Sequence, residues 1–247
     1  MYKPLKNRKG PIRRWMENRP FLFLTLALLI LLVCMPLATT KLSRFLFVEL
    51  TFILVLGVGV SATGYRRWFI GGVLILWMVS AGLELLAYFR ADPSVIGWLT
   101  VINELSSLVF LLCCIVFLLR FIFSADKVNT NSVFAATSSY LLLALIWAFA
   151  YHFTYKINPQ AFNLPDQAFD TAWLKMVYFS LVTITTLGYG DILPVSPFAR
   201  MLAGVEAVVG QLYLAVLIAW LVGLTISNRQ HQRWQRSEKI ERGLREN

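Results

Sequence analysis

The stretch that decides the fold reads Thr185-Thr186-Leu187-Gly188-Tyr189-Gly190-Asp191. Successive groups along an ordinary strand point to opposite sides, so their carbonyl oxygens do not converge on one axis. Gly188 and Gly190 can adopt positive φ without a Cβ clash, and this freedom lets the backbone direct successive oxygens to the same side. The side chains of Leu187 and Tyr189 then point away from the carbonyl oxygens and pack around the backbone as an outward cuff. The Thr186 hydroxyl adds one more oxygen at the inner end of the row of carbonyls.

The stretch resembles the potassium-channel signature, T-x-G-Y-G-D, in which backbone carbonyls of four chains replace the water shell of K⁺. The resemblance implies that residues 185–191 form a selectivity filter, with K⁺ as the permeant ion and no other cofactor. It assigns ion binding to the backbone carbonyls of Thr186, Leu187, Gly188 and Tyr189. A glycine-rich turn between two membrane helices is the alternative interpretation, although the flanking residues also fit a filter.

The residues before this stretch read as a short helix over 170–185, with Asp170 as its N-cap. Such a helix is about 24 Å long, which is too short to cross roughly 30 Å of hydrocarbon. We therefore expect it to be re-entrant, which is possible at membrane depth only if it is buried in protein or lines a wet cavity. Its carbonyl end would face that cavity, where the negative end of the helix dipole favours a cation.

The composition indicates a protein that crosses a membrane. Hydrophobic residues make up 58% of the 247 residues, and charged residues only 15%. We therefore expect an all-α, polytopic membrane fold. Most of the net charge of +10 flanks the apolar runs. The positive-inside rule and anionic lipid explain basic residues in that position better than a nucleic-acid partner does.

No grouping of residues indicates an enzyme or a metal centre. Cys34, Cys113 and Cys114 all lie in apolar runs and read as small core residues. His152 and His231 are too far apart in the sequence to suggest a metal site. The sequence also shows no Ser/His/Asp grouping, P-loop or dinucleotide-binding fingerprint.

Apolar runs predict six membrane-crossing helices, over 21–38, 45–62, 68–89, 96–123, 133–153 and 197–226. Basic residues gather before the first run, after the second, after the fourth and after the sixth, which predicts that both termini are cytoplasmic. The filter would then lie at the outer mouth of a multi-pass protein of the cell membrane. A basic start and an apolar run also fit a signal peptide, but the first run is long and lacks a small-residue cleavage site.

The resemblance divides the chain into four parts. Residues 1–20 are a basic cytoplasmic N-terminus, 21–130 a four-helix membrane module, 131–226 the pore domain, and 227–247 a basic cytoplasmic tail. The pore domain would contain an outer helix, a pore helix, the filter and an inner helix. Because each chain carries one filter, four copies are needed to close a pore, which implies a homotetramer. We expect membrane lipids as partners, with anionic lipid at the basic termini.

The four-helix module occupies the position of a voltage sensor but lacks its charges. Its fourth span carries one arginine, Arg120, at the cytoplasmic end, whereas steep voltage gating draws on roughly 3–4 charges in each subunit. We therefore expect a potassium-selective channel without strong voltage gating. A weakly selective cation channel and a non-conducting membrane subunit that needs a partner are the alternatives.

Gly210 lies twenty residues after Gly190, where related channels have a hinge glycine in the inner helix. Close helix packing is the other explanation for a glycine at this point. The residues expected to face the central cavity and form a gate lie just beyond it, and three of them share one helix face: Gln211, Leu214, Ile218 and Val222. An ordinary packed helix face is the alternative for these side chains.

Three residues depart from the pattern that is common around such filters. Leu187 replaces a more frequent valine, Phe179 replaces a tryptophan that hydrogen-bonds the filter tyrosine, and Val182 replaces a bracing carboxylate. The remaining candidates for a brace to the filter aspartate are Tyr178 and Trp173.

Glu206 is the acidic residue within the inner helix. A buried acid at a helix centre costs on the order of 3 kcal/mol, so it should have a partner. One interpretation is a brace to the pore helix or to the filter backbone. The preferred interpretation is a partly wet residue near the outer interface.

Overall fold

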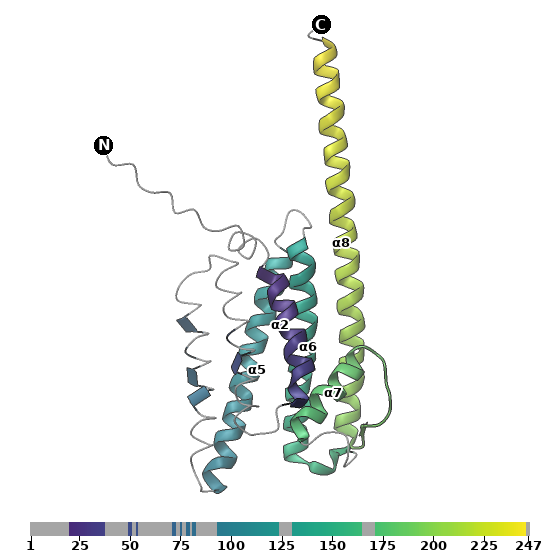
Figure 1. Cartoon of the computed structure of the whole chain (residues 1–247). Helices are drawn as coiled ribbons and strands as arrows, with labels where there is room; N and C mark the ends of the chain where they lie inside the picture. Colours follow the sequence, from purple (N-terminus) through teal and green to yellow (C-terminus); the bar gives the residue numbers. More distant parts are fainter. Residues whose placement is uncertain are drawn as a thin grey trace, which may run out of the picture.

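The computed structural model describes residues 20–37, 93–123, 130–164 and 171–245, together with isolated positions between 49 and 82 (Figure 1). The described part is all-α apart from two strands of two residues each. The elements in chain order are α2 (Pro20–Cys34), η1 (Met35–Leu37), α5 (Pro93–Phe123), α6 (Thr130–Ile157), η2 (Pro159–Ala161), β1 (Phe162–Asn163), α7 (Ala172–Ile184), β2 (Leu193–Pro194) and α8 (Pro197–Arg245).

Four stretches of these helices are long and apolar enough to cross a membrane: Pro20–Leu37, Leu105–Phe123, Thr130–Ile157 and Pro197–Gly223. They correspond to the first, fourth, fifth and sixth predicted spans. The predicted spans at 45–62 and 68–89 lie outside the described residues, apart from isolated positions. The same is true of the basic N-terminus and of the loop between α5 and α6.

Helix α6 lies at the centre of the bundle, with α2, α5 and α7 packed against it (Figure 1). Without a hydrophobic driving force in lipid, membrane helices associate through close packing and interhelical hydrogen bonds. Small side chains on α6, including Ala135 and Ser138, are fully buried. The Thr25 hydroxyl of α2 lies 2.9 Å from the Ser138 hydroxyl and donates to the Phe134 carbonyl at 3.0 Å. The first predicted span therefore packs directly on the outer helix of the predicted pore domain.

A second apolar cluster holds the end of α6 against the residues that follow the 185–191 stretch. It joins Tyr151, Ala161, Phe162, Met176, Phe179, Ile192 and Ala199. Strands β1 and β2 pair antiparallel beside it, with Phe162 opposite Pro194. The backbone amide of Val195 donates to the Ala161 carbonyl at 2.8 Å. This clip fixes the path of the chain between the stretch and α8.

Helix α8 extends beyond the predicted membrane span at 197–226. The basic residues that the sequence predicts as a cytoplasmic tail continue the same helix without a break to Arg245, for 49 residues in all. A helix of that length extends about 73 Å, and its last part runs beyond the end of the bundle (Figure 1). The boundary at 226 is one of composition, where apolar residues give way to basic ones, and the backbone does not change there.

Candidate functional site

Helix α7 ends at Ile184, directly before the 185–191 stretch. It has 13 residues, which corresponds to about 20 Å, so it is too short to cross a membrane, as the sequence predicts. Its N-cap is Thr171, whose hydroxyl accepts from the Leu174 amide at 3.4 Å. The prediction of Asp170 as N-cap is therefore wrong by one residue. The side chains of Asp and Thr can both accept from amides of the first turn, so the sequence alone does not distinguish Asp170 from Thr171. Asp170 itself lies outside the described residues.

The backbone after α7 alternates its conformation. Thr186, Gly188 and Gly190 have φ of 58°, 59° and 78°, whereas Leu187 and Tyr189 between them do not have positive φ. The two glycine conformations are as the sequence predicts. A Cβ added at either glycine would meet nothing within 4 Å, so the backbone conformation, and not a lack of space, is what requires glycine there.

Thr186 adopts the same left-handed conformation without being a glycine, which the glycine pattern of the sequence does not predict. A non-glycine residue in this region costs of order 1–3 kcal/mol and persists only where its surroundings hold it. The amides of Leu187 and Gly188 both donate to the Val182 carbonyl, at 3.0 and 3.3 Å. These hydrogen bonds fold the start of the stretch back onto the last turn of α7.

Residues 185–191 are exposed on the surface of the single chain. The side chain of Leu187 is 56% exposed and that of Tyr189 is 68% exposed. The outward cuff expected for these two side chains is therefore not packed by residues of their own subunit.

Tyr178 provides a hydrogen bond between α7 and the end of the stretch. Its hydroxyl donates to Asp191 Oδ2 at 2.8 Å. Partial desolvation, together with the hydrogen bond to Asp191, raises the pKa of Tyr178 to about 12. The phenol therefore keeps its proton and remains a donor at neutral pH.

Trp173, the second candidate brace, points elsewhere. Its ring packs against Phe149 and His152 of α6, with centroid distances of 4.4 and 5.5 Å. Within the described part of the chain its indole nitrogen has no hydrogen-bond partner. Phe179 packs edge-on against Tyr151 and Phe162, at 4.9 and 5.7 Å. In place of a hydrogen-bond donor, this position thus supplies an apolar contact to α6.

Glu206 is fully buried between three helices, so the preferred interpretation of a partly wet residue is wrong. The Tyr151 hydroxyl of α6 donates to its Oε2, and the Ser180 hydroxyl of α7 lies 2.5 Å from its Oε1. The same Ser180 hydroxyl lies 2.7 Å from the Ala144 carbonyl. Sequence reasoning missed Tyr151 and Ser180, although the cost of burying an acid did signal that partners must exist.

Helix α8 packs tightly against the end of α7 at Gly210. A Cβ at this position would lie 2.6 Å from Ile184 Cγ1 and 2.8 Å from the Ile184 carbonyl oxygen. The Tyr140 hydroxyl of α6 donates to that same carbonyl at 2.8 Å. Close packing therefore explains the glycine, and its role as a hinge stays a prediction. Nothing in the sequence pattern had identified Tyr140.

The predicted cavity face of α8 lies away from the bundle of its own chain. Gln211, Ile218 and Val222 are exposed and Leu214 is partly buried. By contrast, Leu217 and Trp220 pack against the core of α2, α5 and α6. The exposed side chains of Gln211, Ile218 and Val222 are thus available to face other copies or a central cavity.

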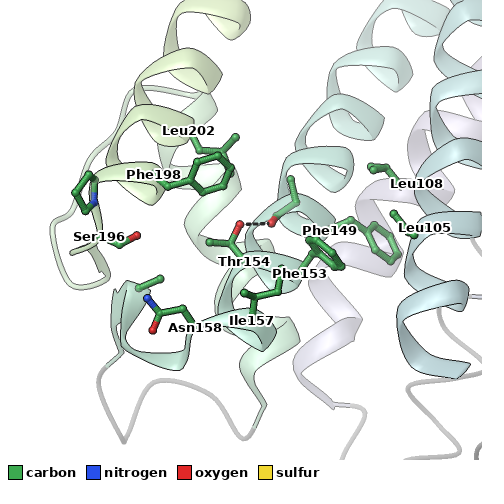
Figure 2. Close-up of a pocket in the computed structure, with 13 residues that line it drawn as sticks. Leu105, Leu108, Phe149, Phe153, Thr154, Ile157, Asn158, Ser196, Phe198 and Leu202 are labelled. Carbon is green, nitrogen blue, oxygen red and sulfur yellow. Dashed lines mark hydrogen bonds between the residues drawn. The ribbon is translucent and has the colours of Figure 1, made fainter. Parts of the chain in front are cut away.

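A cavity of about 650 Å³ lies between α5, α6 and the start of α8 (Figure 2). Its walls are mostly apolar, with Leu105 and Leu108 on one side and Phe198 and Leu202 on the other. The Thr154 hydroxyl in its wall already donates to the Ala150 carbonyl at 2.8 Å. Such a lining does not replace the water shell of a cation, so this cavity is not part of an ion path.

Comparison with known proteins finds a family model, described as an ion channel, that matches residues 139–226. The potassium voltage-gated channel protein shk-1 of Caenorhabditis elegans is 47% identical over 45 residues. This match covers 18% of the present chain and 8% of the relative, so it spans only a small part of that protein. No solved structure matches the chain.

Proposed function

We propose that this chain conducts K⁺ passively through residues 185–191. It is a member of the tetrameric potassium-channel superfamily through its ion channel domain at residues 139–226. The chain is a membrane-embedded ion channel and not an enzyme. Selectivity for K⁺, assembly of four identical copies, and a place in the cell membrane with cytoplasmic termini are parts of the proposal.

The observation that carries the proposal is the alternation of backbone conformation at Thr186, Gly188 and Gly190. Rings of backbone carbonyls can replace the hydration shell of K⁺. An alternating backbone allows the carbonyls of residues 186–189 to line one path, because successive peptide groups need not point to opposite sides. Multi-ion repulsion then lets the bound ions leave.

Assembly into a tetramer is supported by what one chain leaves uncovered. The stretch occurs once per chain, and the large side chains of Leu187 and Tyr189 are more than half exposed. Neighbouring copies would cover these side chains and surround the path with four equivalent strands. The exposed face of α8 that carries Ile218 and Val222 would then line the inner part of the pore.

Strong voltage gating is not part of the proposal. Over the stretch Leu105–Phe123, helix α5 carries one basic residue, Arg120, in its last turn, and that side chain is exposed. Moving one charge through 100 mV is worth about 2.3 kcal/mol, whereas steep gating needs roughly 3–4 charges in each subunit. An arginine at the helix end can also reach the interface without moving.

The proposal is tested by Gly188→Ala, with Gly204→Ala as the matched control. Alanine at 188 would have to adopt a left-handed conformation, which costs about 1–2 kcal/mol per residue, while a Cβ at Gly204 meets nothing within 4 Å. We expect K⁺ flux from proteoliposomes to fall about tenfold or more for Gly188→Ala and to be unchanged for Gly204→Ala. Equal flux from both variants, at equal amounts of assembled protein, would contradict the role of the stretch.

A weakly selective cation channel is the second candidate. It is favoured by the loss of bracing around the filter, because Phe179 offers no donor and Trp173 packs against α6. In that case the same stretch conducts both K⁺ and Na⁺. The ratio of their permeabilities separates the two candidates.

A further inference from the structure

The Glu206 carboxyl joins the three helices of the pore domain at one point. It lies on α8, contacts the Tyr151 hydroxyl of α6 and the Ser180 hydroxyl of α7, and has no exposed surface. Ser180 also contacts the Ala144 carbonyl of α6. Three oxygen–oxygen contacts therefore form a chain that runs from Tyr151 through Glu206 and Ser180 to Ala144.

Counting protons along this chain determines the state of the carboxyl. Each contact needs one proton, and a backbone carbonyl or an ionised carboxylate can only accept. Tyr151 and Ser180 supply one proton each, which leaves one of the three contacts without a donor if Glu206 is ionised. A protonated Glu206 completes the set: Tyr151 donates to Oε2, Oε1–H donates to Ser180, and Ser180 donates to the Ala144 carbonyl at 2.7 Å.

The charges around Glu206 agree with this count. Among the described residues, the titratable groups that interact with it are Tyr151 and Tyr140 of α6, and neither is a cation. On α7 its contact is the neutral Ser180. In the described part of the chain no lysine, arginine or histidine pairs with it. A buried carboxylate without a cationic partner is costly, and it avoids that cost by holding a proton.

The position of this chain of contacts connects it to the filter. Ser180 lies two residues before Val182, whose carbonyl accepts from the amides of Leu187 and Gly188. A displacement of α7 at Ser180 would therefore move the first residues of the 185–191 stretch. The contact between the Ser180 hydroxyl and the Ala144 carbonyl fixes α7 against α6 at the same position.

We propose that Glu206 is a positioning residue that is held as a neutral acid, and that its proton fixes the pore helix α7 beneath the filter. The proposal rests on the function proposed above for residues 185–191. It predicts a particular pattern of substitutions. In Glu206→Gln, the amide oxygen can accept from Tyr151 and the amide nitrogen can donate to Ser180, so all three contacts persist. In Glu206→Ala two of them are lost, and Ser180 no longer has a partner on α8.

The first measurement is the infrared difference spectrum of the full chain in lipid at neutral pH, wild type minus Glu206→Gln. We expect the carbonyl band of a protonated carboxylic acid in wild type that is absent from the variant. A carboxylate band in its place would overturn the proposal. This measurement does not depend on ion conduction, so it separates a failure of this proposal from a failure of the proposed channel function.

The second measurement is the reversal potential between K⁺ and Na⁺ solutions in planar bilayers. Glu206→Gln should keep the wild-type value, and Glu206→Ala should lose selectivity, shifting the reversal potential toward zero. Loss of selectivity in Glu206→Gln would show that the site needs a carboxylate, which contradicts a neutral acid. If wild type itself reverses near zero, the selective channel function fails, and the infrared band alone decides the state of Glu206.

Discussion

Three residues with positive φ, Thr186, Gly188 and Gly190, set the backbone of the proposed filter. Glycine adopts this conformation at no steric cost, whereas Thr186 does so at a cost of order 1–3 kcal/mol. The hydrogen bonds from the next two amides to Val182 help to offset that cost. The conformation is thus encoded locally, which is why the glycine pattern could be interpreted from the sequence.

At the same scale, Tyr178→Phe tests the brace at the end of the stretch. The change removes the 2.8 Å hydrogen bond to Asp191, and a partly exposed hydrogen bond to a charged group contributes about 1 kcal/mol. We expect the Na⁺ permeability relative to K⁺ to rise roughly fivefold, measured from bi-ionic reversal potentials.

Tyr155→Phe is the matched control, because the Tyr155 hydroxyl has no hydrogen bond within the described residues and the side chain is also partly buried. Its permeability ratio should equal that of wild type. An unchanged ratio in Tyr178→Phe as well would mean that the contact with Asp191 does not brace the filter.

The element on which the site depends is α7, which three separate contacts hold in place. The Tyr140 hydroxyl of α6 caps the Ile184 carbonyl at its C-terminal end, Ser180 joins it to Ala144 and Glu206, and α8 approaches it at Gly210. Each of these contacts involves the last two turns, next to the 185–191 stretch. A short helix of 13 residues thereby becomes a fixed support.

Gly210→Ala tests the α7–α8 contact. Because the new Cβ would lie 2.6 and 2.8 Å from atoms of Ile184, α8 must shift, and overpacking of this kind costs roughly 1–3 kcal/mol. We expect a lower thermal midpoint for the purified protein in detergent and reduced K⁺ flux. Gly204→Ala lies on the same helix, and its new Cβ would have no atom of its own chain within 4 Å, so it should leave the midpoint unchanged or raise it slightly. A Gly210→Ala protein as stable as Gly204→Ala would show that the close approach is not required.

The sequence predicted α7 and the glycine conformations because both depend on neighbouring residues. It could not identify the partners of Glu206, since Tyr151 and Ser180 lie 55 and 26 positions away and are brought together only by helix packing. For the same reason the sequence favours a partly wet position for Glu206. It also leaves two explanations for Gly210, because a glycine pattern does not reveal that the Ile184 backbone lies opposite.

At the scale of the whole molecule, one chain presents an incomplete pore. Helices α2, α5 and α7 all pack on α6, which accounts for the buried faces of the bundle. The 185–191 stretch and much of α8 remain uncovered, with Leu187, Tyr189 and Ile218 each more than half exposed. Surfaces of this kind are what four copies would share around a central axis. K⁺-selective conduction is therefore a property that we claim for the assembled protein and not for the single chain.

The measurement that tests this claim most directly is the reversal potential of the purified full chain in planar bilayers, with K⁺ on one side and Na⁺ on the other. We expect a reversal potential far toward the K⁺ equilibrium value and a current that Ba²⁺ abolishes. A current that reverses near zero would contradict K⁺ selectivity and leave a weakly selective cation channel. The absence of any current, in samples shown by mass to be tetramers, would contradict conduction by this chain alone.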